Sequence, residues 1–134
     1  MAKHEMIAVL IGQADEEYQK RFLNGFLTQM KKADMDVCVF SMYRKYQSTP
    51  ERELGESNIY QLVNYDRFDG IVMLKDTIQT KGIAARLEQE IHDSFAGPVL
   101  MIEQESLFFD SVCTDGYSPI VDLIEHLILK LYTR

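Results

Sequence analysis

Polar side chains that suit ligand binding follow several apolar segments of this chain. Six of them are candidates for ligand contact: Asp15, Tyr18, Lys75, Asp76, Glu103 and Asp115. Carboxylates accept hydrogen bonds from hydroxyl groups, and an aromatic ring can stack on the face of a sugar. These residue types therefore indicate a site for a sugar or a similar polar metabolite. The alternative for each is a solvated loop residue, and for Tyr18 the first apolar position of a helix.

The sequence lacks the motifs of nucleotide binding and nucleophilic catalysis. It contains no G-x-G-x-x-G, no G-x-x-x-x-G-K-[ST] and no G-x-S-x-G. The histidines His4, His92 and His126 are far apart in the chain. Glu88 and His92 have helical i,i+4 spacing, which we interpret as a solvent-facing pair because nothing nearby completes a set of metal ligands. We expect no enzymatic activity, no cofactor and no metal.

Composition limits the class of protein. The 134 residues suffice for one domain, and 21 acidic against 14 basic residues give a net charge of −7. An acidic surface disfavours nucleic acid as a direct partner. No apolar run approaches the roughly 20 residues of a membrane span. Two cysteines are too few for a disulfide scaffold, so we expect a cytoplasmic protein without a membrane contact.

Apolar runs and helical periods alternate along the chain. Continuous runs, typical of strands buried on both faces, occupy residues 6–11, 37–42, 71–74, 99–102 and 111–114. A helical period covers 16–33, and caps at Thr49, Thr80 and Ser118 predict three further helices. This order predicts an α/β, flavodoxin-like three-layer sandwich with a parallel five-stranded sheet in the order 2-1-3-4-5. Cys38 and Cys113 then lie on opposite edges as core thiols, too far apart for a disulfide.

The helix expected after Ser118 is apolar on more than one stripe and has no C-terminal cap. It is either packed on two sides or lacks a partner. A response-regulator receiver domain would share the topology and would place its phosphorylated aspartate at Asp76. That interpretation fails because Glu103 and Asp115 stand near the positions where a receiver has a hydroxyl residue and a lysine.

Three segments resemble the lactose- and galactose-repressor type of sensor domain, which has the type I periplasmic-binding-protein fold. They are the helix–strand junction at 61–72, the strand at 97–102 and the strand–helix segment at 112–128. Residues 15–26, 36–42 and 76–80 are similar to sensor lobes of bacterial signalling proteins with diguanylate-cyclase outputs. No Gly-Gly-Asp-Glu-Phe cyclase motif is present in this chain.

The resemblance implies that residues 1–134 are a single domain, the truncated N-terminal lobe of a two-lobe ligand-binding sensor. The ligand would lie between the lobes, and a missing output domain would regulate transcription or cyclic-di-GMP signalling. The alternative is a homodimerisation module without its own ligand, because first lobes of this family pair through their helices. Phe22, Leu23 and Tyr60 are the apolar residues expected to serve such a dimer.

Overall fold

A computed structural model describes residues 5–43 and 50–113 of the chain. Asp115, the cap residues Thr49 and Ser118, and the expected final helix lie outside the described residues. No helix within residues 5–43 and 50–113 combines the length and apolar character needed to cross a membrane. The described elements, in chain order, are β1 (Met6–Gly12), α1 (Glu17–Lys32), β2 (Asp36–Met42), α2 (Pro50–Glu56), η1 (Ser57–Leu62), η2 (Tyr65–Arg67), β3 (Gly70–Met73), η3 (Lys75–Thr77), α3 (Ile83–Ser94), β4 (Val99–Ile102) and β5 (Asp110–Val112).

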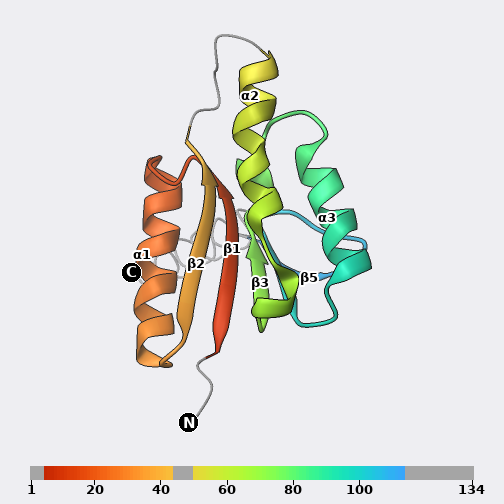
Figure 1. The fold of residues 1–134 in the computed structure, drawn as a ribbon. Coiled ribbons are helices and arrows are strands. Elements are labelled where there is room, and N and C mark those ends of the chain that lie inside the picture. Colours follow the sequence, from red (N-terminus) through yellow and green to blue (C-terminus); the bar gives the residue numbers. More distant parts are fainter. Residues whose placement is uncertain (1–4, 44–49, 114–134) are drawn as a thin grey trace, which may run out of the picture.

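The five strands form one parallel sheet in the order β2-β1-β3-β4-β5. This confirms the predicted α/β class and flavodoxin-like strand order. Helix α1 covers one face of the sheet, and α2 and α3 cover the other, which makes three layers (Figure 1). The arrangement follows from the apolar runs, because a parallel strand between two helical layers must be apolar on both faces.

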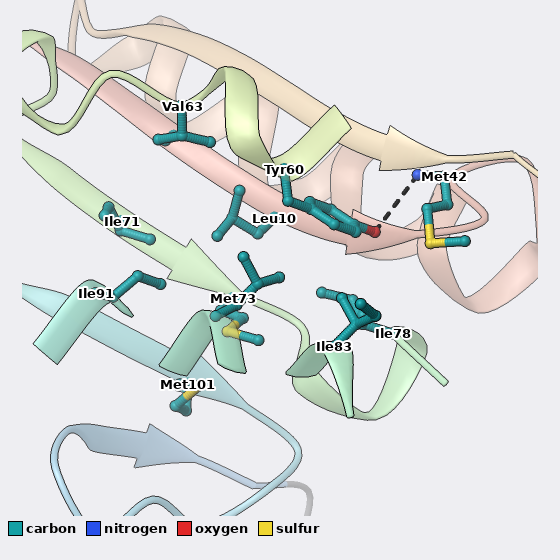
Figure 2. Packing of buried hydrophobic residues seen from close by; sticks show 12 residues of the cluster. Leu10, Met42, Tyr60, Val63, Ile71, Met73, Ile78, Ile83, Ile91 and Met101 are labelled. Atoms are coloured by element: carbon teal, nitrogen blue, oxygen red, sulfur yellow. Dashed lines mark hydrogen bonds between the residues drawn. The ribbon is translucent and has the colours of Figure 1, made fainter. Parts of the chain in front are cut away.

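Each face of the sheet has its own core. On the α3 side, Leu10, Met73 and Leu87 belong to a cluster that also includes the buried ring of Tyr60 (Figure 2). On the α1 side, Val9 and Val72 pack against Phe22. Tyr60 is only 1% exposed, and Phe22 is partly buried against the sheet. The expectation that Tyr60 forms part of a dimer surface is therefore wrong.

The helix expected after Thr49 is short and is followed directly by a tighter helical segment. Helix α2 ends at Glu56, and the chain continues as the 3-10 helix η1. The tighter turn places Tyr60 over the sheet, where its hydroxyl donates to the carbonyl oxygen of Ile11 at 2.7 Å. The same hydroxyl accepts from the amide of Met42 at 3.4 Å (Figure 2). Leu62 is left 68% exposed. Local periodicity missed this break because a sheet contact determines it.

Two smaller expectations are also corrected. Thr80 does not cap α3. The N-cap residue is Gly82, whose φ is 81°. The Thr80 hydroxyl instead donates to Glu53 on α2 at 2.9 Å. Cys38 and Cys113 are far apart in strand order, as predicted, but Cys113 follows β5 and is exposed rather than a core thiol.

Candidate functional site

The chain connections leave a crevice at the carboxyl ends of β1 and β3. The connection from β1 runs through α1 on one face of the sheet, whereas α3 follows β3 on the other face. In open α/β sheets such a switch point is where ligands bind. A pocket of about 470 Å³ lies here, lined by the loop after β1, the start of α1 and the segment after β3: Gln13, Glu16, Glu17, Tyr18, Gln19, Asp76, Thr77 and Gln79.

Close contact between β1 and η3 forms the floor of this crevice. The amide of Gly12 donates to Oγ1 of Thr77 at 2.9 Å, and that hydroxyl donates to the carbonyl oxygen of Leu74 at 2.6 Å. A Cβ atom at position 12 would lie 2.1 Å from the carbonyl oxygen of Thr77. Only glycine fits this position, because it alone has no Cβ atom. Gln19 completes the floor by donating to the carbonyl oxygen of Gly12 at 3.0 Å.

Two residues just beyond strand ends adopt the left-handed backbone conformation. Gln13 follows β1 with a φ of 54°, and Glu103 follows β4 with a φ of 68°. Each is tied to a neighbouring strand, with the amide of Gln13 donating to Met42 at 2.6 Å and that of Glu103 donating to Val112 at 2.8 Å. Positive φ is unfavourable for residues other than glycine and persists only where the surroundings enforce it. The loops at this edge of the sheet are therefore held in defined positions.

Tyr18, Asp76 and Glu103 form an acidic wall, a name we keep for these three residues. The Tyr18 hydroxyl lies close enough to the Glu103 carboxylate for the two groups to interact. Burial is the main cause that raises the pKa of the Tyr18 hydroxyl, and the charges of Glu103 and Asp76 raise it further. The three side chains thus influence one another electrostatically although they come from α1, η3 and the end of β4.

Asp76 is a partly buried member of the acidic wall. Burial raises the pKa of its carboxyl group, backbone hydrogen bonds from Asp76 and Thr77 oppose this, and the charge of Glu103 adds to it. Its Oδ1 atom is buried and has no hydrogen-bond partner among the described residues. A buried carboxylate oxygen ordinarily has a partner, so the unpartnered Oδ1 atom marks Asp76 as a candidate acceptor in this pocket.

The five predicted contact residues within the described part of the chain separate into different places. Tyr18 and Asp76 line the pocket, and Glu103 adjoins them through Tyr18. Lys75 is not among the described residues of the lining and forms an ion pair with Glu88 at 2.7 Å. Asp15 is exposed and borders a separate hollow along the start of α1.

Tyr18 does not occupy the apolar face of α1. Its side chain is 43% exposed, whereas Gln19 is 8% exposed and is the buried residue of this helix. The alternative interpretation of Tyr18 as the first apolar position of the helix is therefore wrong. The true sheet-facing stripe begins at Gln19 and continues through Phe22 and Phe26.

Six residues of the pocket lining were not among the predicted contacts. Two are the acids Glu16 and Glu17, and four are neutral: Gln13, Gln19, Thr77 and Gln79. Charged residues beyond strand ends are a recognisable signal in a sequence. Amide and hydroxyl residues are common in any loop and give no such signal. A weak signal existed for Thr77, which directly follows Asp76 in the segment after β3. Nothing in the local pattern marks Gln19, because its burial depends on the carbonyl group of Gly12.

Glu88 and His92 are not the solvent-facing pair predicted from their spacing. Glu88 is 6% exposed, pairs with Lys75 and accepts a hydrogen bond from Ser106. The ring of His92 stacks on Phe108, with centroids 4.1 Å apart. The loop after β4 covers this side of α3, so both side chains have protein partners. Across residues 5–43 and 50–113, no group of three or more His, Cys, Asp or Glu side chains is placed to hold a metal ion.

No protein-family model matches this chain, and comparison with curated proteins gives no match either. The geometry and chemistry of the switch-point pocket are therefore the basis for assigning a function.

Proposed function

We propose that this chain is the N-terminal lobe of a cytoplasmic two-lobe sensor that binds a sugar or a similar polar metabolite at the switch-point pocket. The observation that carries the proposal is the buried, unpartnered Oδ1 atom of Asp76 beside the exposed ring of Tyr18, within the described part of the chain. A carboxylate acceptor next to an aromatic face suits a molecule with hydroxyl groups around an apolar ring. Binding would control an output domain for transcription or cyclic-di-GMP signalling.

The polarity of the lining supports a hydroxyl-rich ligand. Gln13, Gln19 and Gln79 offer amide groups that both donate and accept, while Asp76 and Thr77 contribute oxygen atoms. The volume of about 470 Å³ falls within the range of small-molecule sites, roughly 300–1,000 Å³. Few purely apolar side chains contribute, which disfavours a lipid or a flat aromatic cofactor.

The exposure of Tyr18 supports a second lobe that would cover the open side of the pocket. Small-molecule sites bury most of the ligand surface. A ligand stacked on a ring that is 43% exposed would remain open to solvent on its far side. Closure of a second lobe over this side would bury the ligand and couple binding to a domain movement.

Isothermal titration calorimetry against a panel of sugars and polar metabolites tests the proposal on the natural full-length protein. We expect one class of ligand to bind and Asp76→Ala to weaken its binding at least about tenfold, the loss expected for a hydrogen bond to a charged group. Asp15→Ala is the matched control, because Asp15 is an acid at the same edge but outside the pocket lining. A ligand bound equally well by Asp76→Ala would contradict the proposal.

Homodimerisation is a second candidate function, and exposed leucines on α2 and η1 favour it. Leu54 is 51% exposed and Leu62 is 68% exposed, and Leu62 borders a shallow hollow with Ile59. A second copy of the chain would cover these side chains. Sedimentation velocity at micromolar concentration should then show a dimer that the double variant Leu54→Ser/Leu62→Ser converts to a monomer. A monomeric wild-type chain would exclude this function for the chain alone.

A further inference from the structure

The lysine that follows β3 is directed away from the pocket. Lys75 immediately precedes Asp76 in the chain, yet its Nζ atom lies 2.7 Å from Oε2 of Glu88 on α3. The Lys75 side chain is 23% exposed and that of Glu88 is 8% exposed. Among the described residues, the pocket lining includes no lysine or arginine. The cation closest in sequence to Asp76 is thus held by a carboxylate on another element.

Glu88 is itself fixed by a second contact. Its Oε1 atom accepts a hydrogen bond from the hydroxyl of Ser106, and Ser106 Oγ accepts from the amides of Phe108 at 3.1 Å and Phe109 at 3.2 Å. One buried carboxylate therefore joins η3, which carries Asp76, to the loop after β4, which begins with Glu103. A buried ion pair with a further hydrogen bond is held in one geometry, because separating it would leave an uncompensated charge.

We propose that Glu88 is a positioning residue that sets the ligand charge accepted by the pocket. By holding the Lys75 ammonium group against α3, Glu88 keeps a positive charge away from Asp76 and leaves the acidic wall negative. The pocket then accepts uncharged and cationic sugars and disfavours anionic ones, because an anion would meet Asp76 without a compensating cation. This inference rests on the proposed binding function and specifies its substrate class.

The first experiment needs no ligand. The pKa of the Asp76 carboxyl group is measured by NMR titration in the full chain for wild type, Glu88→Gln and Glu90→Gln. Glu88→Gln releases the ammonium group of Lys75, which should lower the pKa of Asp76 by about one unit, the effect of a nearby opposite charge. Glu90→Gln is the matched control, because Glu90 lies on the same helix and pairs with Arg86 at 3.6 Å. An unchanged or raised pKa of Asp76 in folded Glu88→Gln overturns the proposal.

Lys75→Gln keeps the proposal falsifiable if Glu88→Gln fails to fold. Because Lys75 already points away from Asp76, its removal should leave the pKa of Asp76 within about 0.3 of the wild-type value, well below the effect of an adjacent charge. A rise of about one unit in the pKa of Asp76 would show that the Lys75 ammonium group already acts on Asp76 in the wild-type protein. That result would overturn the positioning role of Glu88.

A second experiment compares glucosamine, glucose and glucuronate, which are cationic, uncharged and anionic sugars with the same ring. Wild type should bind the first two at least about tenfold more tightly than glucuronate, and Glu88→Gln should reduce that ratio at least threefold through the freed ammonium group. An unchanged ratio overturns the inference. If none of the three binds, the proposed sugar site is contradicted, while the NMR result still decides whether Glu88 positions Lys75.

Discussion

The amide of Gly12 donates a hydrogen bond to Oγ1 of Thr77 at 2.9 Å, which joins the end of β1 to η3 across 65 positions of sequence. This contact brings the loop after β1 next to Asp76 and so assembles the floor of the pocket. Its geometry depends on a residue without a side chain and on a buried hydroxyl group. Both features can be tested separately.

Gly12→Ala should destabilise the protein strongly. The added Cβ atom would lie 2.1 Å from the carbonyl oxygen of Thr77, so β1 or η3 must shift. We expect the free energy of unfolding in urea to fall by about 2–3 kcal/mol. Gly25→Ala is the matched control, since no atom lies within 4 Å of its added Cβ atom and alanine favours a helix by about 1 kcal/mol. Equal unfolding free energies for Gly12→Ala and wild type would contradict the close contact.

Thr77→Val should lower stability through hydrogen bonding rather than through packing. The substitution keeps the shape of the side chain but leaves the buried amide of Gly12 without its acceptor. The expected loss is about 1–3 kcal/mol in chemical denaturation, the cost of an unsatisfied buried group. Thr77→Ser retains the hydroxyl and should lose less. The reverse ranking of Val and Ser would show that the methyl group, not the hydroxyl, matters here.

Tyr60→Phe should reduce stability by about 1 kcal/mol at neutral pH, because the Tyr60 hydroxyl bonds β1 and β2 at once. Burial raises the pKa of Tyr60 well above its ordinary value of 10.0. The folded protein therefore retains this proton while the unfolded chain releases it above pH 10, and the stabilisation by Tyr60 declines as pH rises further. Unfolding measured at pH 7 and pH 11 should show a smaller difference between the two proteins at pH 11. A constant difference would contradict the burial of this hydroxyl.

Asp76→Asn should stabilise the protein slightly while weakening ligand binding. The raised pKa of Asp76 means that the folded state disfavours the charged carboxylate, so its contribution to stability is present below pH 3.8 and is lost as pH rises. At pH 7 the uncharged amide should therefore be slightly more stable than wild type, and at pH 3 the two proteins should be about equally stable. Thermal unfolding at both pH values checks this. If Asp76→Asn is less stable than wild type at pH 7 but not at pH 3, the charge of Asp76 stabilises the loop and the prediction is wrong.

The strands could be located from the sequence because continuous apolar runs are a local signal, and their order followed from the alternation of strands and helices. The apolar runs at β1 and β3 are continuous and bounded by Gly12 and Gly70, so strands buried on both faces were recognisable. The edge strand β5 was weaker, and its residues are exposed. An edge strand packs on fewer neighbours, so its apolar signal is small.

The composition of the site was predictable only in part. Asp76 and Tyr18 were found because strand ends in a parallel sheet meet at one edge. Lys75, adjacent to Asp76 in sequence, points elsewhere because Glu88 on α3 captures it. Gln19 became a pocket residue through a hydrogen bond to Gly12. Such outcomes depend on contacts between distant elements, which spacing along one chain does not reveal.

An NMR titration of the isotope-labelled full chain with glucose and with glucosamine tests the switch-point pocket most directly as a ligand site. Saturable chemical-shift changes should concentrate at Gln13, Tyr18, Asp76 and Thr77, which line the switch-point pocket. They should be lost in Asp76→Ala but not in Asp15→Ala. Shift changes that cluster elsewhere, or that persist unchanged in Asp76→Ala, would contradict a polar-ligand site between β1 and β3.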